Sequence, residues 1–315
     1  MTGTSSGTVG FCGLGMMGAP LAGNLLRKGV PLIVHNRTPE KAGKLLEAGA
    51  RWAETPRAVA EGASSGLVFT VLSDARALRE VLWGRHGIAR GLSPSGLVVD
   101  MSTIAPDQSR TMAGRLATRG LHFVDAPLGG SVDAAEAGTV LFYVGGDPSD
   151  VERVRPYLEK MGRGVEFMGP VGSGTAMKLV NNLLTIGHVA LLSEALALSE
   201  GLGLPRGRVL SVLSAGGAAS RMLESKWDSL ERREYPARFL LRLARKDVDL
   251  VVRTGRRSRR ETPFAREIRR LLREAGAQGH DLEDFSAMAE AALRRLPARP
   301  PEGSTGTGDL PAISP

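Results

Sequence analysis

Residues 169–184 combine a Gly/Pro/Ser-rich turn with a lysine and two asparagines at the start of a long apolar helix. Lys178, Asn181 and Asn182 stand three and four positions apart, so on a helix they share one face. A cation near a helix N-terminus opposes the helix dipole, and an apolar setting removes water from the ammonium. Local stability therefore does not account for the cluster. It is either a lysine reaching solvent beside two structural amides, or a general acid held by neighbouring amides.

Length and composition indicate an ordinary soluble protein of two domains. The chain has 315 residues, 42% hydrophobic and 23% charged. The one cysteine, Cys12, excludes an internal disulfide and favours a reducing compartment, so we expect a cytoplasmic location. The N-terminus has no signal-peptide pattern, and polar residues interrupt the one long apolar run, 175–198. We therefore expect no membrane segment.

The formal charge of +8 comes almost entirely from arginine. Specific nucleic-acid binding needs a basic stripe joined to a known motif or to stacking aromatic residues, and aromatics are only 4% of the chain. We therefore expect no specific nucleic-acid partner, and the excess charge instead favours anionic small molecules. The spacing of the later arginines predicts a solvated helix face. The arginines cluster at Arg253, Arg256, Arg257, Arg259 and Arg260, then at Arg266, Arg269, Arg270 and Arg273.

The first forty residues predict a dinucleotide-binding βαβ unit. A short strand at 9–12 leads into a glycine-rich turn and a helix that ends at Gly29, and a second strand spans 31–35. Glycines in such a turn allow a tight bend and close approach of a pyrophosphate to the helix N-terminus. The predicted cofactor-binding residues of this turn are Gly13, Leu14, Gly15, Met16 and Met17.

The residues after the second strand indicate which nicotinamide cofactor is bound. NAD enzymes commonly place an Asp or Glu there to accept hydrogen bonds from the ribose. This chain has Asn36-Arg37-Thr38 and no carboxylate. An arginine matches a 2′-phosphate in charge and in bidentate geometry, although it could also be an exposed loop residue. The sequence favours NADP(H) and leaves NAD(H) open.

Strands and helices alternate as far as residue 170, which predicts an α/β fold with a doubly wound Rossmann-type sheet. Thr103 follows one strand and either caps the helix opened by Pro106 or meets the nicotinamide. Further helices are expected up to a last one at 282–295, capped by Asp281. The predicted organisation is a flexible start over 1–8, an NADP-binding domain over 9–170, an all-helical domain over 171–296 and a disordered tail over 297–315.

Four blocks of sequence together resemble the β-hydroxyacid dehydrogenase family, which includes 3-hydroxyisobutyrate dehydrogenase and the glyoxylate/succinic semialdehyde reductases. They are residues 10–18, residues 125–130 with Gly138-Thr139, residues 172–182, and Lys246-Asp247. The resemblance covers about residues 8–295. It implies an all-helical second domain that carries substrate contacts and pairs subunits into a homodimer or homotetramer.

The resemblance also implies a role for each matching residue. Lys178 matches the catalytic acid/base, and Asn182 matches the asparagine that supports it. Where the family commonly has Val-Ser-Gly-Gly, this chain has Leu128-Gly129-Gly130-Ser131, so the loop lacks a serine hydroxyl at Gly129 and Ser131 is a shifted replacement. The implied cofactor residues are Leu72, Ser73, Thr103 and Lys246. The implied substrate residues are Gly129, Gly130, Ser131, Phe239 and Asp247.

The sequence therefore predicts an NADP(H)-dependent oxidoreductase that interconverts a small 3-hydroxyacid and its semialdehyde or carbonyl form. Two alternatives stay open. Imine reductases are related, but they usually carry another residue where Lys178 stands. A non-catalytic NADP-binding sensor would have no reason to keep Lys178 and Asn182. No cluster of Cys, His and carboxylates predicts a metal site, and we interpret Cys12 and His188 as core residues.

Overall fold

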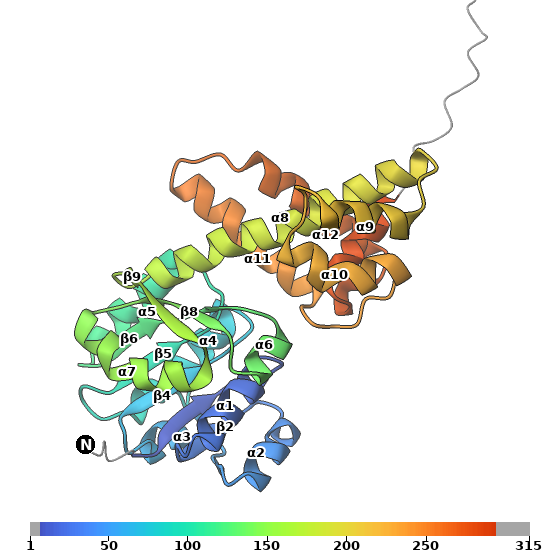
Figure 1. The fold of residues 1–315 in the computed structure, drawn as a ribbon. Coiled ribbons are helices and arrows are strands. Elements are labelled where there is room, and N and C mark those ends of the chain that lie inside the picture. Colours follow the sequence, from blue (N-terminus) through green and yellow to red (C-terminus); the bar gives the residue numbers. More distant parts are fainter. Residues whose placement is uncertain (1–6, 294–315) are drawn as a thin grey trace, which may run out of the picture.

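A sheet with helices on both faces occupies the first half of the molecule, and a group of helices follows it along one long helix (Figure 1). The computed structural model describes residues 7–293. The predicted tail at 297–315 and most of the predicted flexible start at 1–8 lie outside these residues. The α/β fold class is confirmed.

The sheet is parallel over most of its width because helices connect consecutive strands. Its described strands run in the order β3-β2-β1-β4-β5-β6-β8-β7, and β9 also pairs with β8. Order therefore reverses between β1 and β4, and ligands bind at such a reversal in doubly wound sheets. The parallel strands are β1 (Val9–Cys12), β2 (Leu32–His35), β3 (Arg51–Trp52), β4 (Leu67–Thr70), β5 (Leu97–Asp100) and β6 (His122–Asp125).

The last part of the sheet is mixed. β8 (Leu141–Gly145) is antiparallel to β6 and to the short β7 (Leu128–Gly129), whereas β9 (Gly164–Gly169) is parallel to β8. The segment expected as a loop, 126–131, thus contains strand β7. Gly129 pairs with Leu141, so β8 supports the backbone of this segment.

Alternating side chains of the strands fill two separate cores. Phe69 and Val99 belong to the core beneath α1 and α7, while Val68 and Val98 belong to the core beneath α3, α4 and α5. A period of two places neighbouring residues on opposite faces, so both faces are covered. The helices of this half are α1 (Gly18–Arg27), α2 (Gly43–Glu47), α3 (Pro56–Gly62), α4 (Ala75–Trp83), α5 (Pro106–Ala117), α6 (Val132–Glu136) and α7 (Pro148–Met161).

Helix α8 (Ser173–Gly201) joins the two halves and is roughly 43 Å long at 1.5 Å per residue. The buried Asp125, at the end of β6, accepts hydrogen bonds from the backbone N–H groups of Gly172 and Thr175, both at 2.7 Å. These donors would otherwise have no partner at the helix start. Gly174 lets α8 approach the sheet, since a Cβ there would lie 2.3 Å from the Tyr143 carbonyl oxygen.

By length and hydropathy alone, α8 is the one described helix that could cross a membrane. It is the central helix of the second half, where α11, α12 and α13 pack along it (Figure 1). Its outer face is apolar and exposed at Val180, Leu184, Leu191 and Leu198. His188 is exposed on this helix, so its interpretation as a core histidine is wrong.

The remaining helices agree with the expected pattern except at the end. The expected helix at 282–295 is replaced by a 3₁₀ turn at Phe285–Ala287 and a short α13 (Met288–Ala292). Asp281 caps neither; its carboxylate pairs with Arg245 at 2.8 Å, so the capping prediction is wrong. The others are α9 (Arg206–Ala215), α10 (Arg221–Arg232), α11 (Leu241–Arg257) and α12 (Pro263–Ala277).

Candidate active site

A cavity of about 820 Å³ lies between the carboxyl edge of the sheet, the first turns of α8, and helices α10 and α11. Its walls include the segments that follow β4 and β5, where doubly wound sheets bind ligands. Of the residues predicted from sequence, those lining it are Met16, Met17, Leu72, Ser73, Thr103, Gly129, Gly130, Ser131, Lys178, Asn182, Phe239, Lys246 and Asp247. The other predicted cofactor residues lie outside the cavity, in the segments that follow β1 and β2: Gly13, Leu14, Gly15, Asn36, Arg37 and Thr38.

Lys178, Asn181 and Asn182 all face this cavity, as their spacing on one helix face requires. Loss of hydration lowers the pKa of the Lys178 ammonium to about 8. This pKa already includes two neighbouring charges: the carboxylate of Asp247 opposes the shift, and the ammonium of Lys246 adds a smaller contribution in the direction of burial. Within residues 7–293 no hydrogen bond or ion pair engages the amine, so its protons are available to a ligand.

The two asparagines do not bond to Lys178; they form a chain toward α11. The Asn181 amide donates to Asn182 Oδ1 at 3.2 Å, and the Asn182 amide donates to Asp247 Oδ2 at 2.7 Å. Asn182 is 2% exposed, so both of its polar groups are committed inside the protein. Its connection to Lys178 therefore runs through Asp247, whose charge acts on the ammonium.

Lys246 connects the helical half to the sheet half. Its ammonium donates to the Thr103 carbonyl oxygen at 2.7 Å and pairs with Asp247 at 2.9 Å. Thr103 does not cap α5, which begins at Pro106 after Ala105. Thr103 therefore presents its backbone to Lys246 at the cavity wall, and the Lys246 side chain is only 26% exposed.

The glycine-rich turn has the shape that a pyrophosphate requires. Gly13 has φ of 100°, and a Cβ there would lie 2.2 Å from the Val71 carbonyl oxygen. A Cβ on Gly18 would lie 1.9 Å from the Gly13 carbonyl oxygen, whereas Gly15 has no atom within 4 Å of the same position. The outer two glycines thus let the turn close, and the middle one leaves an open approach to the backbone. These residues fit a dinucleotide.

Of the two residues that follow β2, the Asn36 side chain is hydrogen-bonded within the protein and the Arg37 side chain is exposed. Asn36 Oδ1 accepts from the Leu14 N–H at 2.9 Å, and its amide donates to the Thr38 carbonyl oxygen at 2.8 Å. Asn36 therefore holds the glycine-rich turn. Arg37 is exposed and has no hydrogen-bond or ion-pair partner among residues 7–293, so its guanidinium is free to meet an anion beside β2.

Tyr143 on β8 also lines the cavity and was missed by sequence reasoning. Its hydroxyl donates to Asn181 Oδ1 at 3.2 Å, although Tyr143 as a whole is only 8% exposed. In the sequence, Tyr143 is only a tyrosine within an apolar strand. That pattern does not indicate a ligand contact unless β7 is known to pair with β8. Ser131, the shifted hydroxyl of the loop, accepts from the Ala134 N–H at 3.3 Å and caps α6.

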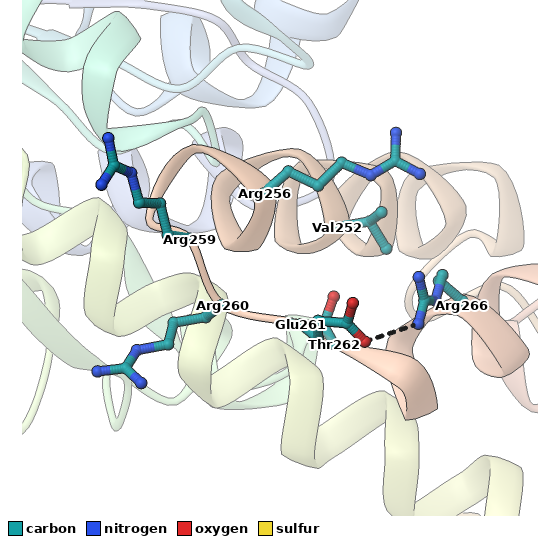
Figure 2. Close-up of a pocket in the computed structure, with 7 residues that line it drawn as sticks. All are labelled: Val252, Arg256, Arg259, Arg260, Glu261, Thr262 and Arg266. Atoms are coloured by element: carbon teal, nitrogen blue, oxygen red, sulfur yellow. Dashed lines mark hydrogen bonds and ion pairs between the residues drawn. The ribbon is translucent and has the colours of Figure 1, made fainter.

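The arginine-rich segment after α11 is not a second ligand site. A cavity of about 240 Å³ lies at the end of α11 and the turn that follows it. In Figure 2 the guanidinium groups of Arg256, Arg259 and Arg260, which line it, point away from one another. Later arginines pair with carboxylates, as Arg270 does with Glu267 and Glu274. Solvated, diverging cations do not enclose an anion, which agrees with the expected solvated face.

Metal ligation has no support in the part of the chain that is described, since no group of three or more His, Cys, Asp or Glu side chains converges in it. Cys12 is buried, and burial raises the pKa of its thiol, so it stays protonated in the core.

Two family models divide the chain at the start of α8. One, described as the NAD binding domain of 6-phosphogluconate dehydrogenase, matches residues 8–169. The other, described as NAD-binding of NADP-dependent 3-hydroxyisobutyrate dehydrogenase, matches residues 172–292. The chain belongs to the β-hydroxyacid dehydrogenase family. The cavity is lined by residues from both matched regions.

Relatives in the β-hydroxyacid dehydrogenase family align with nearly the whole chain. Glyoxylate/succinic semialdehyde reductase 2 of Arabidopsis thaliana is 34% identical over 90% of this chain and 79% of its own. 3-Sulfolactaldehyde reductase of Escherichia coli is 34% identical over 90% of this chain and 94% of its own. The crystal structure of 3-hydroxyisobutyrate dehydrogenase from Salmonella typhimurium superimposes with a TM-score of 0.82 at 27% identity, covering 90% and 99% of the two chains. The chain is an NAD(P)-dependent oxidoreductase of the 3-hydroxyacid dehydrogenase class.

Proposed function

We propose that the protein reduces a small carbonyl compound bearing a carboxylate, such as a semialdehyde, to the corresponding 3-hydroxyacid with NADPH, and catalyses the reverse reaction with NADP⁺. The observation that carries this proposal is Lys178, a partly buried ammonium with a pKa of about 8 and no protein partner among the described residues, in the cavity at the sheet's carboxyl edge. Both protonation states of such a lysine are populated near neutral pH.

The proton step is assigned to Lys178. When bound, the nicotinamide supplies or accepts the hydride. As negative charge develops on the substrate's carbonyl oxygen, the Lys178 ammonium hydrogen-bonds to that oxygen and then donates its proton. In the oxidation direction the neutral amine removes the proton from the hydroxyl group. Burial disfavours the charged amine most strongly, Asp247 favours it and Lys246 disfavours it, and together these three effects set the pH at which Lys178 changes state.

The remaining roles follow from position. Asn182 is a positioning residue, because its amide holds Asp247 and does not reach the ammonium. The cavity is lined on the loop side by Gly129, Gly130 and Ser131. Phe239 also lines it and packs against Phe285, with the two ring centroids 5.3 Å apart. We assign these residues and Asp247 to the substrate side.

The cofactor side is assigned to the glycine-rich turn and to the residues that follow β2, β4 and β5. Leu72, Ser73 and Thr103 line the cavity where the nicotinamide end would lie, with Lys246 behind them. Preference for NADP(H) rests on Arg37, whose guanidinium has no partner among residues 7–293 and would bond a charged 2′-phosphate more strongly than the neutral hydroxyl of NAD(H).

The charge of the cavity favours an anionic substrate. Its lining carries six cationic side chains against two acidic ones, which are Asp133 and Asp247. Three of the six cations are ion-paired, Arg238 with Asp133 at 2.9 Å, Lys246 with Asp247 at 2.9 Å and Lys226 with Asp284 at 2.8 Å. The excess therefore lies in Lys178, Arg163 and Arg221, which form no ion pair with any residue between 7 and 293. An imine reductase would need no such excess of positive charge. A sensor without catalysis would have no use for an unpartnered ammonium in the cavity.

The test is NADPH oxidation with glyoxylate, succinic semialdehyde, methylmalonate semialdehyde, tartronate semialdehyde and a cyclic imine. Wild-type protein should reduce at least one semialdehyde, and Lys178→Ala should abolish that turnover while NADPH still binds, as measured by fluorescence. Asn182→Ala should slow turnover less severely. Lys44→Ala, an exposed lysine on α2, is the matched control and should match wild type.

Either of two outcomes would remove the proposal. Turnover of the imine alone would place the protein with the imine reductases, and full turnover by Lys178→Ala would reject the lysine as proton donor. Tight NADPH binding without turnover of any compound in the panel would favour the sensor.

A further inference from the structure

The position where the family's substrate loop usually carries a serine is filled here by a side chain from another strand. A Cβ on Gly129 would lie 2.4 Å from the Tyr143 hydroxyl oxygen and 3.1 Å from the ring carbon that bears it. No side chain at 129 could coexist with Tyr143 in this arrangement. The absent serine and the tyrosine are therefore one feature, in which Tyr143 brings a hydroxyl group to the place the loop has left empty.

The strand pairing fixes this hydroxyl firmly. β7 and β8 are antiparallel, with Gly129 opposite Leu141, and the Tyr143 N–H donates to the Pro127 carbonyl oxygen at 2.8 Å. Side chains of antiparallel neighbours on one face stand close together. The tyrosine therefore reaches across the loop to the cavity from a strand that is itself held in the sheet, which is a more rigid origin than the loop.

The hydroxyl can donate to a ligand. Burial raises the pKa of the Tyr143 phenol, so it keeps its proton through the physiological range. Its present acceptor, Asn181 Oδ1, is 3.2 Å away, longer than the 2.7–2.8 Å typical of O–H···O bonds. A carboxylate is a stronger acceptor than an amide oxygen and would compete for this proton.

The loop's own groups are partly engaged elsewhere. The Ser131 hydroxyl oxygen accepts the Ala134 N–H as the cap of α6 and keeps its own proton, and Gly129 lies in the β7–β8 ladder. Arg163, which also lines the cavity, is close enough to Tyr143 for its charge to lower the phenol's pKa against the effect of burial. Arg163 has no side-chain partner between residues 7 and 293, so this corner of the cavity holds one neutral donor beside one free cation.

We propose that the Tyr143 hydroxyl is the substrate-binding donor that replaces the loop serine, and that it hydrogen-bonds the carboxylate of the substrate. This inference rests on the proposed function, since it assigns the recognition of the acid group within the same cavity. Tyr143 is thereby a specificity residue for carboxylate-bearing carbonyl compounds, while the proton chemistry stays with Lys178.

Tyr143→Phe removes only the hydroxyl and keeps the ring. The probes are 3-hydroxypropionate, glycolate and 4-hydroxybutyrate, each titrated by calorimetry into the protein–NADPH complex, which cannot react with an alcohol. Because hydrogen bonds to charged groups are among the stronger ones, we expect at least one hydroxyacid to bind wild type and to bind Tyr143→Phe about tenfold or more weakly. In turnover, KM for succinic semialdehyde should rise by a similar factor, while KM for butanal, which lacks the carboxylate, should change less than about twofold.

Two further variants test whether the Tyr143 hydroxyl contacts the substrate carboxylate directly or only supports Asn181. Asn181→Leu removes the same hydrogen bond from its other side; if it weakens the hydroxyacids as much as Tyr143→Phe does, the hydroxyl acts through Asn181 and the proposal fails. Gly129→Ser should weaken hydroxyacid binding in wild type and should be less harmful in the Tyr143→Phe background, because the clashing oxygen is gone.

The outcomes separate this inference from the proposed function. Equal hydroxyacid affinity in wild type and Tyr143→Phe overturns the inference, and so does a wild-type complex that binds none of the three acids. The proposed function is decided independently, by whether turnover depends on Lys178.

Discussion

The pH at which Lys178 changes protonation state should move when Asp247 loses its charge. Burial shifts the Lys178 pKa from 10.5 to about 8, and the Asp247 carboxylate limits that shift. At pH 7.5 a lysine with a pKa of 8 is about one quarter neutral, against about one thousandth for an unperturbed lysine. Reduction requires the ammonium and oxidation requires the amine, so we expect kcat/KM for reduction to fall above about pH 8 and kcat/KM for oxidation to rise up to it.

Asp247→Asn keeps an oxygen that can accept from Asn182 and removes the negative charge. An opposite charge at close range typically shifts a pKa by 1–3 units, so we expect the lysine's apparent pKa to fall by about one unit, to about 7. At pH 8 the protonated fraction would drop from about one half to about one tenth. Reduction should therefore slow about fivefold more at pH 8 than at pH 6, where both proteins are almost fully protonated.

The assay is the pH profile of kcat/KM for reduction of the preferred semialdehyde, from about pH 6 to pH 10. Asp249→Asn is the matched control: it lies two residues further along α11, pairs with Arg269 and Arg273 at 3.6 Å, and does not line the cavity. An Asp247→Asn profile that keeps the wild-type midpoint, with only a uniform loss of rate, would refute the electrostatic coupling.

Three further results are expected. Arg37→Asp should raise the dissociation constant of NADPH about tenfold or more relative to that of NADH, as measured by fluorescence, whereas Arg85→Asp, another exposed arginine, should leave the ratio alone. Burial raises the pKa of Asp100 to about 6, so ionisation of this group destabilises the fold increasingly as pH rises from about 4 to 6. The free energy of unfolding, measured with urea, should therefore fall between pH 5 and pH 8 by about 1 kcal/mol less in Asp100→Asn than in wild type, and an unchanged pH dependence would contradict the assignment. Leu191→Glu should convert an assembled homodimer or homotetramer to smaller species in sedimentation, because Leu191 is 65% exposed on the apolar face of α8, and an unaltered assembly would show that this face is not the contact.

The fold was predictable where local pattern and burial agree. Helix α4 (Ala75–Trp83) follows from its local sequence alone, since Asp74 caps its start and the apolar period stops at Gly84. The prediction of a last helix at 282–295 was wrong because contacts with residues distant in the sequence override the helical pattern there. Asp284 is 1% exposed, binds Lys226 at 2.8 Å and accepts from the Phe239 N–H at 3.0 Å, which fixes this segment as 3₁₀ turns.

The candidate site shows the same limit. Helical spacing placed Lys178 beside two asparagines, but the partner that Asn182 binds, Asp247, lies 65 residues further along the chain. Spacing within one helix says nothing about such a partner. Tyr143 was missed for a related reason: its meaning depends on Gly129, which only the pairing of β7 with β8 brings beside it.

The contact of Asp125 with the start of α8 also bears on how the protein folds. The donors at Gly172 and Thr175 follow their acceptor by 47 and 50 residues, so the first turn of the helix that carries Lys178 gains these two hydrogen bonds only when β6 is in place. A fragment beginning at residue 171 would start its longest helix with unpaired N–H groups facing no acceptor. The helical half is thereby coupled to the sheet during folding through the two hydrogen bonds that Asp125 accepts.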